Sequence, residues 1–176
     1  RRQRQMCIRD RTRINVQKIA SLKDLFNSPI NEVSFELNSE EQIEKILSVA
    51  GDLLDQKFKL QKSKILRDMS VANLFFEPST RTRNTFEIAA KRTSAKTINV
   101  DLANSATKKN ETLMDTMHTL KAMQIDMFVI RHKQNGLPHR VAENIDGVAI
   151  LNAGDGINAH PTQALLDICL LYTSPS

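Results

Sequence analysis

The sequence predicts an α/β fold of three layers, α/β/α, in which a four-stranded parallel sheet lies between helices. Two observations lead to this prediction. From residue 71 onward, apolar runs of strand length alternate four times with segments of helical periodicity. Such alternation is typical of parallel strands joined by right-handed crossovers. In addition, 40% of the residues are hydrophobic, which is enough to bury a core.

Ahead of residue 71 the pattern predicts helices and loops. A short helix is expected to end at Ser28-Pro29. Ser39 and Gln42 form a capping-box pattern before a longer amphipathic helix. The charged segment Gln56–Asp68 is predicted to be a loop. Packing explains these segments, and none of them suggests chemistry.

Four strands and four helices are expected from residue 71 onward. The strands span Val71–Phe76, Thr97–Val100, Met127–Ile130 and Val148–Asn152. The helices span Thr82–Arg92, Glu111–Gln124 and Leu137–Ile145, and a fourth begins at Pro161. Periodicity predicts that the first two helices turn these residues inward: Phe86, Ala89 and Ala90, then Leu113, Met114, Met117, Leu120 and Met123.

The turn after the first strand carries the strongest functional signal. Its sequence, Ser79-Thr80-Arg81-Thr82-Arg83, stands where a helix begins. The first N–H groups of a helix have no partner within it, and they lie at the positive end of its dipole. Together with hydroxyls and guanidinium groups they suit a phosphate or carboxylate dianion. The simpler alternative is that Ser79 only caps the helix.

Polar residues also follow the other three strands. They include Ser105 to Lys109, Arg131-His132 and Asn152 to Gln163. In an open parallel sheet, ligands bind beyond the carboxyl ends of the strands. The fold would therefore gather these side chains on one rim, which predicts an anion site there.

Composition limits the other classes of function. The net charge of +5 comes from the arginine-rich residues 1–13, and the rest of the chain is neutral. With one Tyr and no Trp, a nucleic-acid platform is not expected. No membrane span or signal peptide is expected either. Cys7 and Cys169 lack metal-ligand spacing, and are expected to be thiols of a cytoplasmic protein.

The two ends look foreign to the body of the chain. Residues 1–13 and 171–176 resemble translated adapter sequence at the edges of assembled fragments. We therefore expect a non-native basic head at 1–13, one domain at 14–170 and a non-native tail at 171–176.

Four segments in order resemble the aspartate carbamoyltransferases, specifically their amino-terminal, carbamoyl-phosphate-binding half. The resemblance runs from about Val71 to Asp167. It rests on Phe75 to Arg83, Lys108 to Thr112, Val129 to His132 and His160 to Asp167. These segments resemble the family's signature turn, its lysine loop, its third-strand arginine and its histidine motif.

The resemblance implies a role for each matching residue. Ser79, Thr80, Arg81 and Thr82 would hold the phosphate of carbamoyl phosphate, with Arg131 closing on it. His160, Thr82 and Arg131 would lie near the carbamoyl oxygen, and Gln163 near the carbamoyl NH2 group. Ser105 and Lys109 would reach into the neighbouring active site of a homotrimer. The residues expected to act in catalysis are Arg81, Thr82, Lys109, Arg131 and His160.

The expected reaction transfers the carbamoyl group to L-aspartate, giving N-carbamoyl-L-aspartate and phosphate in pyrimidine synthesis. Fixed cations and donors would stabilise negative charge on the carbonyl oxygen and the departing phosphate. No metal, cofactor or covalent nucleophile is expected, because Ser79 has no nearby base and the four histidines show no ligand spacing. His132 is expected to be structural.

Departures from the family pattern are Thr107 and Asn110 beside the lysine pair, and Lys133 where Pro is usual. The family's aspartate-binding domain is expected to be absent, so the 176 residues alone would be inactive. Alternatives are an ornithine carbamoyltransferase-like enzyme, a non-catalytic anion-binding half-domain, and a polyanion-binding protein that uses the amino-terminal arm.

Overall fold

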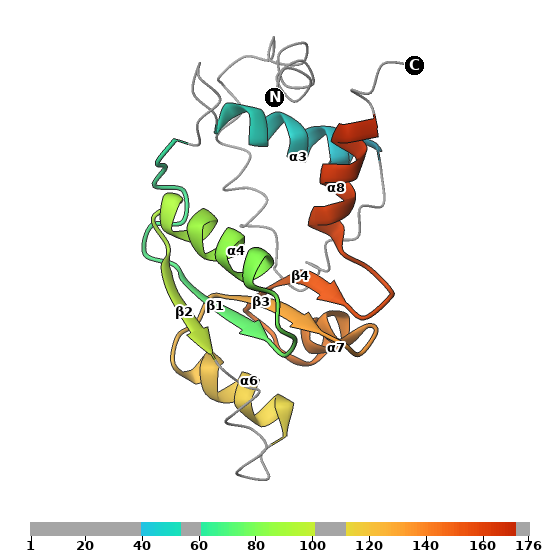
Figure 1. Ribbon diagram of the computed structural model, residues 1–176. Helices are drawn as coiled ribbons and strands as arrows, with labels where there is room; N and C mark the ends of the chain where they lie inside the picture. The colour runs from blue at the N-terminus through green and yellow to red at the C-terminus, as the bar shows by residue number, and fades with distance from the viewer. Residues whose placement is uncertain (1–39, 54–60, 101–111, 172–176) are drawn as a thin grey trace. The chain divides into compact units, whose positions relative to one another are not determined.

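Four strands form a parallel sheet in the order β2-β1-β3-β4 (Figure 1). In chain order they are β1 (Ser70–Phe75), β2 (Lys96–Val100), β3 (Met127–His132) and β4 (Ala149–Asp155). All three pairings are parallel, so the predicted four-stranded sheet is confirmed. These elements come from a computed structural model, which describes residues 40–53, 61–100 and 112–171.

Three helices pack against this sheet: α4 (Thr80–Arg92), α6 (Leu113–Ala122) and α7 (Leu137–Asn144). Helices α6 and α7 share one core with the sheet, formed by Ala72, Leu74, Met117, Leu120, Ile125, Phe128, Ile130, Leu137, Val141, Ile145, Val148 and Ile150. Because side chains alternate along a strand, Asn73 and Asn99 point to the other face. There Asn99 Nδ2 donates to Glu87 Oε2 of α4 at 2.9 Å. Helices therefore cover both faces (Figure 1).

The chain divides into two compact units. The sheet and its three helices belong to the unit that contains the described residues from Lys62 to His160. The other unit contains α3 (Glu40–Asp52) and α8 (Pro161–Leu171). Within the described ranges, no helix has both the length and the apolar character needed to cross a membrane.

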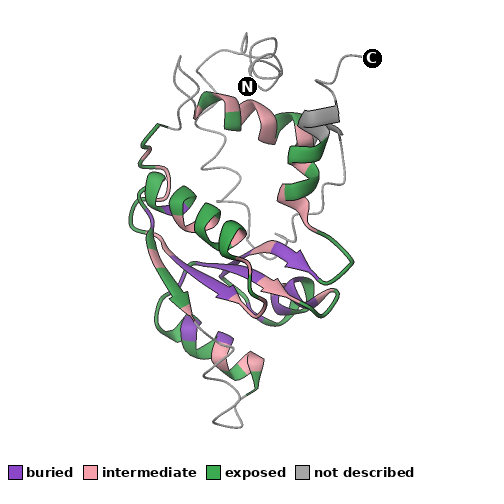
Figure 2. Cartoon of the chain, in the orientation of Figure 1, coloured by how far each residue is buried: buried purple, intermediate pink, exposed green. Residues whose placement is uncertain are grey.

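Two predictions of buried side chains are wrong. Met123 is 64% exposed, because α6 ends at Ala122 and the helical periodicity stops with it. Ala89 is also exposed, and α4 buries Ala90 instead. The inner stripe of α4 is narrow, as the exposed green face of this helix shows (Figure 2). The expected helix before Ser28 lies outside the described residues.

Candidate functional site

The amino-terminal end of α4 is open in the way that an anion site requires. Strand β1 ends at Phe75, and Ser79 stands at the N-cap position with a φ of −147°. Its side chain makes no capping hydrogen bond, and the first turn contains no acidic residue. The simple capping role for Ser79 is therefore wrong in this structure. The N–H groups of Thr80, Arg81 and Thr82 lie at the positive end of the helix dipole.

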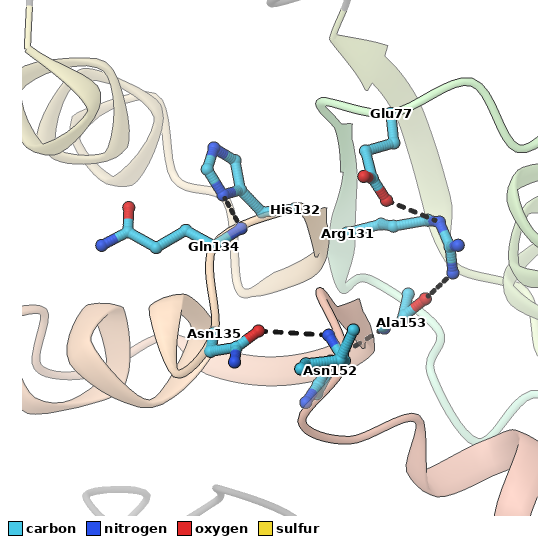
Figure 3. Close-up of polar contacts among 9 residues, drawn as sticks. Glu77, Arg131, His132, Gln134, Asn135, Asn152 and Ala153 are labelled. Atoms are coloured by element: carbon cyan, nitrogen blue, oxygen red, sulfur yellow. Dashed lines mark hydrogen bonds and ion pairs between the residues drawn. The ribbon is translucent and has the colours of Figure 1, made fainter.

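Arg131 lies beside the segment that leads into α4. It pairs with Phe75 across β1 and β3, and its carbonyl oxygen accepts a hydrogen bond from Phe76 N at 2.9 Å. On the other side, its Nη1 donates to the carbonyl oxygen of Ala153 at 2.9 Å. Glu77 Oε2 lies 3.7 Å from Arg131 Nε (Figure 3). The guanidinium group is thus held between β4 and the turn after β1.

The Nε atom of Arg131 is buried and makes no hydrogen bond within the described part of the chain. The distance of 3.7 Å to Glu77 is too long for one. A buried donor without an acceptor is costly. An anionic ligand at this point would supply the missing acceptor.

Gly154 brings Arg131 and His160 to the same place. A Cβ atom at Gly154 would lie 2.4 Å from Arg131 Nη1 and 3.3 Å from His160 Cδ2. Its φ of +120° is also one that other residues rarely adopt. Glycine at this position therefore leaves room for the guanidinium group and the imidazole ring close to the space that a Cβ atom would occupy.

Asp155 follows directly and is 2% exposed. Burial raises the pKa of its carboxyl, but hydrogen bonds from Asn158, Gly136, Asn152 and Ala159 outweigh burial, and the net pKa is lowered. The group is therefore a carboxylate at neutral pH. The sequence patterns assigned no role to Asp155 and did not predict its burial. The Gly154-Asp155-Gly156 pattern at a strand end was the available signal.

His132 has structural contacts. Its Nδ1 accepts a hydrogen bond from Gln134 N at 2.9 Å (Figure 3), and its ring packs edge-on against Phe76 with centroids 4.8 Å apart. Burial lowers the pKa of His132, Lys133 lowers it further, and Glu77 acts in the opposite direction. A neutral ring that accepts at Nδ1 fits this environment.

The predicted site residues fall into three groups. The unit that contains the sheet holds Ser79, Thr80, Arg81, Thr82, Arg131 and His160. Gln163 belongs to the other unit, on α8, where its Nε2 donates to Asp167 Oδ1 at 2.9 Å. Ser105 and Lys109 lie outside the described residues. Sequence reasoning treated Glu77 only as part of a turn, although an acid before Pro78 at a buried strand end could have marked it.

The site offers hydrogen-bond donors and cations that suit an anion. Across the described ranges, no three His, Cys, Asp or Glu side chains come together to hold a metal ion. The arrangement can bind a phosphate group at the start of α4 and polarise a neighbouring oxygen with Arg131 and His160.

Comparison with known proteins agrees with the family resemblance of the sequence. The family described as "Aspartate/ornithine carbamoyltransferase, carbamoyl-P binding domain" matches residues 31–173. The aspartate carbamoyltransferase catalytic subunit of Vesicomyosocius okutanii is 74% identical over 130 residues, which are 74% of this chain and 41% of that protein. The chain therefore spans less than half the length of this curated relative.

Solved structures agree in fold. The catalytic subunit of M. jannaschii aspartate transcarbamoylase matches with a TM-score of 0.64 and 40% identity, over 76% of this chain and 43% of that chain. Aspartate transcarbamoylase from Trypanosoma cruzi, in complex with carbamoyl phosphate and aspartate, matches with a TM-score of 0.56 and 36% identity. That match covers 62% of this chain and 34% of the other.

Proposed function

The chain belongs to the aspartate/ornithine carbamoyltransferase family through its carbamoyl-phosphate-binding domain, and we propose that it holds the carbamoyl phosphate site of an enzyme that carbamoylates L-aspartate. One observation carries this proposal. The turn that leads into the uncapped start of α4 contacts Arg131, whose Nε is buried without a hydrogen-bond acceptor among the described residues. An anion that accepts from both would satisfy the open helix end and the buried guanidinium together.

In the proposed reaction the amine of aspartate attacks the carbonyl carbon of carbamoyl phosphate. A C–N bond forms, the bond from that carbon to the phosphate oxygen breaks, and the proton that the amine loses passes to the departing phosphate. Negative charge develops on the carbonyl oxygen and then on the departing phosphate. Arg131, His160 and Thr82 would stabilise the first charge, and Ser79 to Thr82 with Arg131 the second.

The remaining assignments complete this proposal. Gln163 would contact the carbamoyl NH2 group, and Ser105 and Lys109 would enter a neighbouring site of a homotrimer. Residues that bind aspartate would lie in the part of the family's length that the 176 residues do not cover. The 176 residues alone would therefore not catalyse the reaction.

We place the protein in the cytoplasm, without a nucleic-acid partner. Residues 14–170 would form the domain, and residues 1–13 and 171–176 would be non-native ends.

Calorimetric titration of the chain with carbamoyl phosphate and with phosphonoacetate tests the proposal. Arg81→Ala is expected to weaken binding, because it removes a cation from the first turn of α4. Arg140→Ala is the matched control, since Arg140 is an exposed arginine on α7. If the chain does not bind, or if the two variants bind equally well, the anion site is refuted.

The identity of the acceptor amine needs a separate test, because the family includes ornithine carbamoyltransferases. A full-length protein containing this sequence would be assayed with aspartate and with ornithine. Product from aspartate alone is expected. Product from ornithine alone would replace the proposed acceptor, and no product from either would favour a non-catalytic anion-binding domain.

A further inference from the structure

We propose that Asp155 is a positioning residue, whose buried carboxylate holds the loop after Arg131 and the turn before His160 in the geometry of the proposed anion site. This inference rests on the proposed carbamoyl phosphate site and deepens it. It concerns a residue that would not touch the ligand itself.

The carboxylate of Asp155 accepts four hydrogen bonds. Oδ1 accepts from Ala159 N at 2.8 Å and from Asn152 Nδ2 at 3.2 Å. Oδ2 accepts from Gly136 N at 2.8 Å and from Asn158 Nδ2 at 3.0 Å. With an exposed fraction of only 2%, the group depends on these donors for the stability of its charge.

Two hydrogen bonds between Asp155 and Ala159 hold the segment that ends at His160. Ala159, the residue before His160, donates its N–H to the carboxylate and accepts a hydrogen bond from Asp155 N at 3.1 Å. The two residues form an antiparallel bridge. The backbone and the side chain of Asp155 therefore both close the turn between these two residues, which fixes the position of His160.

The second loop follows Arg131 and is bound to the same turn at three points. Gly136 N donates to the Asp155 carboxylate. Gly156 N donates to the carbonyl oxygen of His132 at 2.8 Å, and Ile157 N donates to Asn135 Oδ1 at 3.1 Å. Asp155 is the only one of the described residues whose side chain accepts from both loops.

Arg131 and His160, which adjoin these two segments, both approach the position of Gly154. If the carboxylate is replaced by an amide, the Nδ2 group of the new side chain faces N–H donors and cannot accept from them. At least one loop must then move. Since a misplacement of about 1 Å can cost about 10²-fold in function, a small movement is enough to weaken the site.

The variant Asp155→Asn tests this inference, with Asp126→Asn as its matched control. Asp126 Oδ2 also accepts a backbone N–H, from Ser70 at 2.7 Å. However, it precedes β3 and so lies at the opposite end of the sheet from Arg131. Both variants lose a carboxylate that accepts from the backbone, but only one touches the proposed loops.

Binding of carbamoyl phosphate and of inorganic phosphate would be measured for the wild-type chain and both variants. Asp155→Asn is expected to weaken carbamoyl phosphate binding at least about tenfold. Phosphate binding should fall less, because only its contact with Arg131 depends on Asp155, whereas carbamoyl phosphate would lose contacts with both Arg131 and His160. Asp126→Asn should change neither. An equal loss for both ligands would mean general destabilisation, and an unchanged affinity for carbamoyl phosphate would also overturn the inference.

A second measurement keeps the test independent of ligand binding. NMR signals of the His160 ring and of the Arg131 Nε–H group would be recorded without ligand. They should shift in Asp155→Asn, and also in the milder variant Asn135→Ala, but not in Asp126→Asn. If the wild-type chain binds no anion, the proposed function fails, whereas unchanged signals in both loop variants would refute the positioning role alone.

Discussion

Replacing Gly154 by alanine should weaken the proposed anion site by displacing Arg131. The new Cβ atom would lie 2.4 Å from Arg131 Nη1 and 3.3 Å from its Cζ atom. Cβ atoms in folded proteins essentially never come within 3.0 Å of another heavy atom in this way. The guanidinium group is also fixed on its other sides, by Ala153 and Glu77. It therefore has to leave its present position.

The size of the effect follows from two contributions. The φ of +120° strains a residue with a side chain by about 1–3 kcal/mol, which lowers the free energy of unfolding. A hydrogen bond to a charged group contributes about 1.5–3 kcal/mol. Losing the one that Arg131 would make to the ligand should weaken carbamoyl phosphate binding roughly 10- to 150-fold.

Calorimetry with carbamoyl phosphate measures the affinity, and urea unfolding measures the stability. Gly147→Ala is the matched control, because Gly147 also has a positive φ, +69°, but a Cβ there meets nothing within 4 Å. Gly147 lies before β4, at the end of the sheet away from Arg131. The control should lose stability and keep its affinity. Wild-type affinity in Gly154→Ala would refute the reasoning.

Three further predictions concern titration and local structure. The pKa of Asp155 in the folded protein is lowered from its ordinary value of 3.8, so its ionised form stabilises the fold above that pH. This stability should be lost as the pH falls through the pKa of the folded protein. Urea unfolding between pH 6 and pH 2 should show this loss in the wild type and not in Asp155→Asn. His132→Phe removes the acceptor of Gln134 N and should cost about 0.5–1.5 kcal/mol of unfolding free energy. Calorimetry should show an unchanged carbamoyl phosphate affinity. A large loss of affinity would contradict the structural role of His132. Thr112→Ala breaks the capping box with Asp115 and should cost about 0.5–2 kcal/mol in the same unfolding assay, whereas Thr119→Ala, on the same helix, should cost less.

The fold was largely readable from the sequence because its signals are local. The run Val71–Phe76 predicted a buried strand, and β1 occupies Ser70–Phe75 with four of its residues buried. The turn after it predicted a helix start within two residues of the observed Thr80. Helix ends were less predictable. Met123 continues the helical spacing of apolar residues, but it lies beyond the end of α6 and is exposed to solvent.

The site was predictable only in part. Arg131 and His160 were predicted to be site residues, because each follows a predicted strand or precedes a predicted helix in a segment that resembles the family. Glu77, Gly154 and Asp155 were not identified. Their importance arises from contacts with residues far away in the chain, such as Asp155 with Gly136 and Arg131 with Ala153. No spacing along the sequence encodes those contacts.

The sequence by itself determined the alternation of strands and helices, and the placing of hydroxyls and arginines at the start of α4. The reason is that periodicity and capping depend on residues within a few positions of one another. Only the tertiary structure decided the strand order β2-β1-β3-β4, which puts β1 next to β3 and so brings Arg131 to the turn before α4. It also decided that Asp155 is a buried carboxylate, because the Gly136 amide that it accepts from reaches it only when β3 and β4 pair side by side.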